Sequence, residues 1–206
     1  MNFKSLILPY SLVFITTLVL ATLDFPFWLI LLIVFVAILV PFFFMQIHTA
    51  YWSNDLKKVE KFLQANSKKP LQAFTLSLAH GNRTEVEENL RGILAKHKQP
   101  LIQQVYSTVL HLLHRDYEAA RTSADQISKV SLRSYYLAYV AAKKGDIDEA
   151  KRFMESFDKP WMSHAMNSYI ALHEGNPTLA ELEHQKAIDT SRGIQKYSVV
   201  HSHNHL

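Results

Sequence analysis

Histidines are the side chains of this chain that are best placed for chemistry. His111 and His114 lie three residues apart, a spacing that brings two imidazoles to one face of a helix, and residues 201–206 alternate His with other residues. Imidazole nitrogens bind Zn, Ni or Cu. The chain has no cysteine, and no further ligand cluster accompanies either group of histidines. We therefore expect no metal site and no cofactor; the alternative is that the C-terminal histidines bind a metal.

Catalytic signatures are missing from the sequence. His114-Arg115-Asp116 matches a kinase catalytic-loop triplet, but the Asn that should follow, the DFG motif and the Gly-rich loop do not occur. No P-loop, G-x-G-x-x-G, H-E-x-x-H or G-x-S-x-G motif occurs either. We therefore expect a protein that is not an enzyme. The alternative, a membrane-associated hydrolase or transferase, would show an activity that vanishes with one His or Asp while the fold survives.

Two uncharged apolar runs, Ser5–Leu23 and Phe25–Met45, open the chain and are separated by Asp24. A helix needs roughly 20 apolar residues to cross a bilayer core. Because backbone polar groups must be paired inside lipid, each run predicts a helix, and together they predict a transmembrane hairpin over residues 1–50. For the first run, a signal peptide cleaved after Val19-Leu20-Ala21 is the alternative.

Basic residues flank the two runs but are absent from the loop between them. Lys4 precedes the first run. Five lysines follow the second run: Lys57, Lys58, Lys61, Lys68 and Lys69. Positive charge stays on the cytoplasmic side, so both termini should be cytoplasmic, and the absence of cysteine and of sorting signals favours a bacterial plasma membrane. The five lysines are also candidates for contact with anionic headgroups of the lipid bilayer; the alternative is that they only set the topology.

The remaining residues combine a mild positive charge with few glycines. The chain has 22 Lys and Arg against 18 Asp and Glu, a formal net charge of +4, which is too small an excess to indicate nucleic-acid binding. Five glycines in 206 residues and the lack of a strand-and-hairpin pattern predict an all-α protein. We expect a helical repeat domain over 51–191 and a polar, His-containing tail over 192–206.

A repeated pattern runs through residues 51–191. His114–Arg121, Lys144–Lys151 and Glu174–Glu181 align with one another at offsets of thirty residues. The apolar columns before these segments recur at helical spacing, so each unit predicts two helices joined by a tight turn. A small residue marks the close crossing of the two helices in each unit: Val59, Val86, Ala120, Ala150 and Ala180. Helix breaks are expected at four prolines: Pro70, Pro100, Pro160 and Pro177.

These units resemble the tetratricopeptide repeat (TPR) family, and the best match covers Ser131–Pro160. The residues that fall near family positions are Tyr135, Leu137, Ala138, Gly145, Ala150 and Pro160. The family unit has 34 residues, whereas two spacings in this chain are 30. The resemblance implies a TPR-like α-solenoid of about four helical hairpins, with an extended concave surface that binds a protein or peptide partner.

Tyr135, Tyr139 and Tyr169 lie on the expected first helices of their units, which line the groove in such arrays. Aromatic side chains dominate binding hot spots, so these three are our candidate partner-binding residues; packing between repeats is the alternative. We expect a membrane-anchored cytoplasmic adaptor or scaffold with a membrane-associated partner. The alternative is an accessory subunit of a larger membrane complex, held by its transmembrane hairpin. The array end around Ile188–Val200 either mediates self-association or is capped by the tail.

Overall fold

The computed structural model describes residues 11, 15–20, 22 and 25–202. In this part of the chain 82% of the residues are helical and no strand occurs, which confirms the all-α prediction. The chain divides into two compact units, Met1–Thr49 and Ala50–Leu206. This division lies one residue from the boundary predicted at residues 50 and 51.

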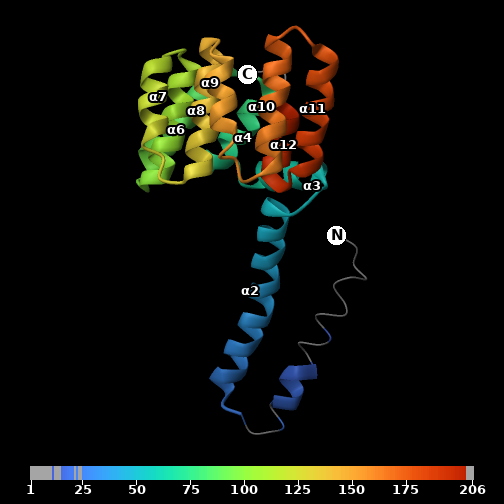
Figure 1. Ribbon diagram of the computed structural model, residues 1–206. Helices are drawn as coiled ribbons and strands as arrows, with labels where there is room; N and C mark the ends of the chain where they lie inside the picture. Colours follow the sequence, from blue (N-terminus) through green and yellow to red (C-terminus); the bar gives the residue numbers. More distant parts are fainter. Residues whose placement is uncertain (1–10, 12–14, 21, 23–24, 203–206) are drawn as a thin grey trace. The chain divides into compact units, whose positions relative to one another are not determined.

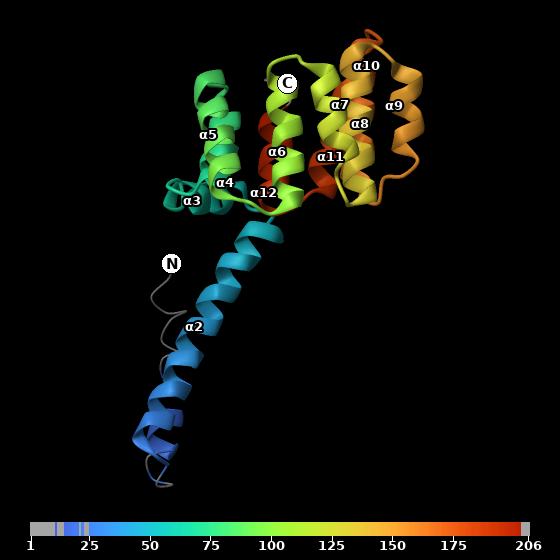
Figure 2. The ribbon, with the colours of Figure 1, turned by 90° about the vertical axis from the view of Figure 1, so that its left-hand side faces the viewer.

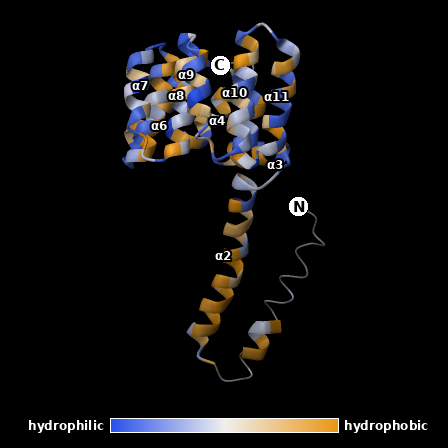
Figure 3. Ribbon diagram, in the orientation of Figure 1, coloured by the Kyte–Doolittle hydropathy of each residue, from blue (hydrophilic) through white to orange (hydrophobic). Residues whose placement is uncertain are grey.

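The first unit contains most of α2 (Phe27–Tyr51), the one helix among the described residues that is long and apolar enough to cross a membrane. At about 1.5 Å per residue, its 25 residues extend about 38 Å, which exceeds the roughly 30 Å of a hydrocarbon core. Its most apolar window has a mean hydropathy of 3.0 and is only 6% buried, and Figure 3 shows hydrophobic residues along most of the helix.

The predicted first span, Ser5–Leu23, lies largely outside the described residues. Within that run, residues 11, 15–20 and 22 are helical. Lys4 and Asp24 lie outside the described part of the chain as well. The second membrane span and the cytoplasmic location of both termini therefore stay predictions.

The second unit is built from paired helices (Figures 1 and 2). Its elements are α3 (Leu56–Ala65), α4 (Pro70–His80), α5 (Arg83–Lys96), α6 (Pro100–Leu113), α7 (Tyr117–Asp125), α8 (Val130–Lys144), α9 (Ile147–Met154), α10 (Pro160–His173), α11 (Pro177–Thr190) and α12 (Gly193–Ser202). The closest packing joins α4 to α5, α6 to α7, α8 to α9 and α10 to α11. We call the leading member of each pair a first helix and its partner a second helix. Second helices occupy the edges of both views, α7 and α11 in Figure 1 and α5 and α9 in Figure 2.

Residues that were predicted to shape these pairs occupy the expected places. Four helices begin at the predicted breaks, Pro70, Pro100, Pro160 and Pro177. The five predicted crossing residues are all buried, with exposed fractions between 0% and 5%: Val59, Val86, Ala120, Ala150 and Ala180. Proline at the first position of a helix costs no hydrogen bond, and a small crossing residue lets two helices approach closely. Local sequence therefore indicates where four of these helices start and where small residues are buried at the crossings.

An Asn or Asp side chain caps the start of every second helix. Asn82, Asp116, Asp146 and Asn176 each accept a hydrogen bond from the backbone N–H three residues later, at 2.9–3.2 Å. Such a cap contributes about 1 kcal/mol of helix stability. The residue that precedes each cap has a left-handed backbone. Three are glycines, Gly81, Gly145 and Gly175, and the fourth is Arg115, with a φ of 60°.

Arg115→Gly is expected to raise the free energy of unfolding by about 1 kcal/mol. The left-handed conformation costs a residue with a side chain roughly 1–2 kcal/mol, and the greater flexibility of glycine in the unfolded chain offsets part of this gain. Urea unfolding of the detergent-solubilised chain, followed by circular dichroism, measures the change. Arg115→Ala keeps the strain and serves as the control. A Gly variant that is no more stable than the Ala variant would contradict the assignment.

Residues 193–202 form a packed helix, and the prediction of a polar tail over 192–206 is wrong for these residues. Tyr197 is 2% exposed and Val199 is 6% exposed, and Tyr197 packs with Val59, Leu63 and Leu76. The histidines of this segment suggested a solvated tail, whereas its apolar residues bury one face. Because α12 contacts α3, α4 and α11, the last helix packs on the first ones. This packing favours a capped array end around Ile188–Val200, and self-association there stays a prediction.

Gly193 fixes the place where α12 joins the start of the second unit. Its N–H donates to the Ser53 carbonyl oxygen at 2.8 Å, and its φ is 56°. A Cβ at this position would collide with the Ala50 carbonyl group and with Cα of Tyr51. Glycine is therefore required by both the backbone angle and the close approach. The chain enters the second unit at the same end at which α12 begins.

Candidate partner-binding face

Two neighbouring first helices, α8 and α10, carry the three tyrosines that the sequence singled out. Tyr135 and Tyr139 are four residues apart on α8, and Lys143 follows after another four. On α10, Trp161 and Tyr169 lie eight residues apart. Because residues at such spacings share one side of a helix, each helix presents one row. We call these five residues the aromatic face.

The rings of the aromatic face pair across the two helices. The centroids of Tyr135 and Trp161 lie 5.2 Å apart with an interplanar angle of 62°, and those of Tyr139 and Tyr169 lie 5.6 Å apart. These distances fall in the range of favourable aromatic pairs, roughly 4.5–7 Å. All four rings are half-buried. The structure therefore places the three predicted tyrosines on one face. Their rings pack against neighbouring side chains of the domain and are still partly accessible to solvent.

Lys143 adds a cation to the aromatic face. Its Nζ lies 5.3 Å from the ring centroid of Tyr139 and 4.8 Å from that of Tyr169, within the distance of a cation–π interaction. Desolvation, and after it the charge of Arg115, lowers the pKa of Lys143. Sequence reasoning missed this residue, although its spacing of four from Tyr139 was a signal that could have identified it.

Burial affects the phenols of the aromatic face. It raises the pKa of Tyr135 to about 12 and also raises the pKa of Tyr139 and of Tyr169. Phenols are protonated at neutral pH with or without this shift, so all three hydroxyls are hydrogen-bond donors. The hydroxyl of Tyr139 is buried and has no hydrogen-bond partner within the described part of the chain. A buried polar atom of this kind costs about 1–3 kcal/mol.

Tyr139→Phe is expected to leave the free energy of unfolding unchanged or to raise it by about 1 kcal/mol, because it deletes an unpaired buried hydroxyl and keeps the ring. Urea unfolding of the full chain in detergent measures the difference. The comparison variant Tyr139→Leu removes the ring contacts with Tyr169 and Lys143, and we expect it to lose stability. A clear loss of stability in the Phe variant would show that the hydroxyl has a partner.

Polar side-chain contacts link each helix pair to the next one. The pair of Arg121 and Glu149 has its closest atoms 2.8 Å apart, and Lys151 lies 3.2 Å from Glu174. His114 Nε2 lies 3.2 Å from a carboxylate oxygen of Glu87. This histidine thus contacts the preceding pair. Among the described residues, no group of three or more His, Cys, Asp or Glu is arranged to hold a metal.

The five lysines predicted at the membrane surface lie on α3 and on the loop that follows it, and all are exposed. Lys58 pairs with Asp55 at 3.6 Å. The other four, Lys57, Lys61, Lys68 and Lys69, form no ion pair with any described residue. Their charges are therefore free to act on groups outside the chain.

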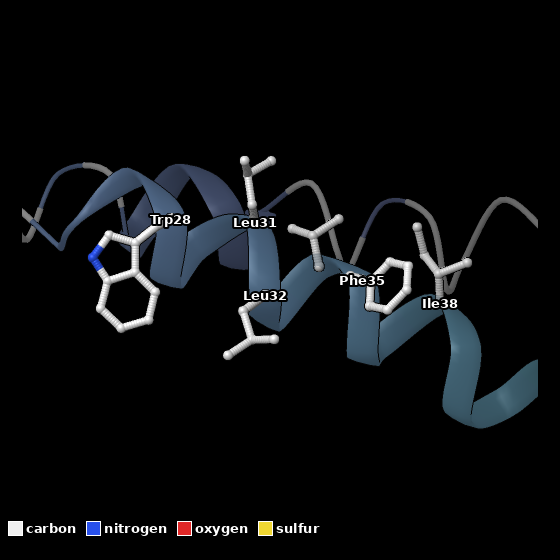
Figure 4. A pocket seen from close by; sticks show the side chains of 6 residues that line it. Trp28, Leu31, Leu32, Phe35 and Ile38 are labelled. Carbon is white, nitrogen blue, oxygen red and sulfur yellow. The ribbon is translucent and has the colours of Figure 1, made fainter.

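A second candidate surface lies on α2, where six apolar side chains line an open depression. Trp28, Leu31, Leu32, Phe35 and Ile38 are labelled in Figure 4, and Val34 completes the lining. Such a depression offers a place for apolar side chains of another helix or for lipid.

Comparison with known proteins yields no relative. No known family model matches this chain, and no curated protein or solved structure shows significant similarity to it.

Proposed function

We propose that this protein is a membrane-anchored adaptor or scaffold of the TPR-like α-solenoid type, which binds a protein or peptide partner through its first helices. The observation that carries the proposal is one apolar helix joined to a domain of four consecutive helix pairs with a shared turn pattern. Repeats of this kind supply binding surfaces more often than catalytic centres.

The aromatic face is the surface that best fits partner binding. Its rings are ordered by each other and by Lys143, so little conformational freedom remains to be lost on association. Half-buried Tyr and Trp side chains combine a large apolar area with a polar group, which is the composition of binding hot spots. Tyr135, Tyr139 and Tyr169 are therefore the residues through which we expect the partner to bind.

The accessory-subunit function is the second candidate, and the apolar depression on α2 favours it. In that case side chains of another membrane protein fill the depression lined by Trp28 and Phe35, and the helical domain caps the assembly. The two functions place the specific contact on different units of the chain.

Exchange of the anchor separates the two functions. The intact chain and a variant with residues 1–49 replaced by an unrelated two-span anchor are purified from native membranes in mild detergent, and the bound proteins are identified by mass spectrometry. An adaptor keeps its partner after the exchange, whereas an accessory subunit loses it. Lys143→Ala/Tyr169→Ala should also release the adaptor's partner. Lys151→Ala/Leu182→Ala alters the second helices and should retain it.

A further inference from the structure

The alternation of helix directions gathers the loops of the second unit at two ends. One end contains α3 and the loops that precede each first helix and α12. It includes the Ser53–Gly193 hydrogen bond, so we call it the anchor end: residues 52–69, 97–99, 126–129, 155–159 and 191–192. The far end contains the loops between first and second helices: residues 81–82, 114–116, 145–146 and 174–176.

Charge is distributed unequally between these two ends. The anchor end has nine Lys and Arg against four Asp and Glu, a net charge of +5, whereas the whole chain has +4. The far-end loops have one Arg against three acidic residues, a net charge of −2. The basic excess of the protein is therefore located at the end where the chain leaves α2.

Helix capping does not explain these basic residues. Lys69, Lys129 and Lys159 occupy the cap positions of α4, α8 and α10, and none of them makes a side-chain capping hydrogen bond. A lysine offers no acceptor there, and its charge opposes the helix dipole. The second helices, by contrast, all begin with an Asn or Asp cap. Lysine at three first-helix starts thus costs local stability and indicates a role outside the helices.

Membrane topology does not explain them all either. Lysines and arginines set orientation when they lie within about 15–20 residues of a span, and Lys98, Lys129, Lys159 and Arg192 lie beyond that range. Folding nevertheless brings them to the anchor end. Four residues, 52–55, separate α2 from α3, a length that reaches at most about 14 Å. This end therefore stays close to where α2 ends.

We propose that the anchor end binds the anionic phospholipid headgroups of the membrane that holds α2. The inference rests on the proposed membrane anchor. A basic side chain close to an anionic surface increases binding roughly fivefold, and salt screens the effect. The exposed side chains of Lys98, Lys129 and Lys159 extend the basic surface beyond the lysines of α3.

The test uses the absence of cysteine from the native chain. Single cysteines replace two exposed residues, Ser128 at the anchor end and Thr178 near the far end, and each carries a fluorophore. The full chain is placed in phosphatidylcholine nanodiscs with or without phosphatidylglycerol, and a lipid with a spin-labelled headgroup quenches the fluorophore. Lys98→Glu/Lys159→Glu is the test variant, and Arg115→Glu/Lys144→Glu changes the far end by the same charge.

We expect phosphatidylglycerol to increase quenching of the Ser128→Cys label. Salt at about 1 M should return this quenching to the level in neutral lipid, and so should Lys98→Glu/Lys159→Glu. The Thr178→Cys label and the far-end variant should show no such response. Quenching that is equal in the two lipid compositions, or unaffected by the test variant, would overturn the inference. If the chain also fails to remain in the nanodisc, the proposed membrane anchor itself is wrong. Extraction of native membranes with carbonate tests the anchor independently, because an anchored chain resists extraction.

Discussion

Gly193→Ala is expected to lower the free energy of unfolding of the helical domain by about 3 kcal/mol or more, an effect reserved for strained or overfilled positions. Two costs combine in this variant. The left-handed φ of 56° disfavours any side chain, and the new Cβ would strike the Ala50 carbonyl group. Either α12 or residues 50–51 have to move, and we expect the hydrogen bond from Gly193 to Ser53 to be lost. Urea unfolding of the full chain in detergent measures the change.

Gly145→Ala is the matched control for this prediction. Gly145 also has a positive φ, 88°, but a Cβ there would meet no atom within 4 Å. The Gly145→Ala variant should therefore lose only the backbone cost of roughly 1–2 kcal/mol in its free energy of unfolding. Equal losses of stability in the two variants would show that the close approach of Gly193 to residues 50–51 adds nothing to the free energy of unfolding.

Leu63→Ala and Tyr197→Ala are each expected to lower the free energy of unfolding by about 2–5 kcal/mol, because both side chains are buried in one cluster. The two losses should not add. We expect a coupling energy of at least about 0.5 kcal/mol in the double variant, since the residues share a packed contact between α3 and α12.

Urea unfolding of the two single variants and the double variant measures this coupling. Lys196→Ala, which changes a half-buried side chain of the same helix, is the control and should have a small effect. Strict additivity of Leu63→Ala and Tyr197→Ala would contradict the packing of α12 on α3.

The helices of the second unit were predictable because their signals are local. Proline starts a helix at residues 70, 100, 160 and 177, and small residues such as Ala120 and Ala150 mark the crossings. The packing of α12 was missed because its partners, Val59 and Leu63, lie more than a hundred residues earlier in the chain. No periodic signal within a ten-residue segment reports such a distant contact.

The candidate site was also predictable only where its signals are local. The repeated columns placed Tyr135, Tyr139 and Tyr169 on first helices, and the structure brings the last two into ring contact. The position of Lys143 over two rings depends on how α8 meets α10, which the sequence does not encode in any short motif. The basic anchor end likewise arises from loops that are about thirty residues apart and that meet only because the helices alternate in direction.

Photo-crosslinking in native membranes tests the adaptor account most directly. A photoreactive residue is placed at Tyr169 on the aromatic face, at Leu182 on the second helix α11, or at Phe35 on α2, in otherwise intact chains. We expect a defined crosslinked protein from position 169, which is absent from position 182 and is lost when Lys143→Ala is added. Crosslinks from position 35 with none from position 169 would contradict the proposal and would assign the specific contact to α2.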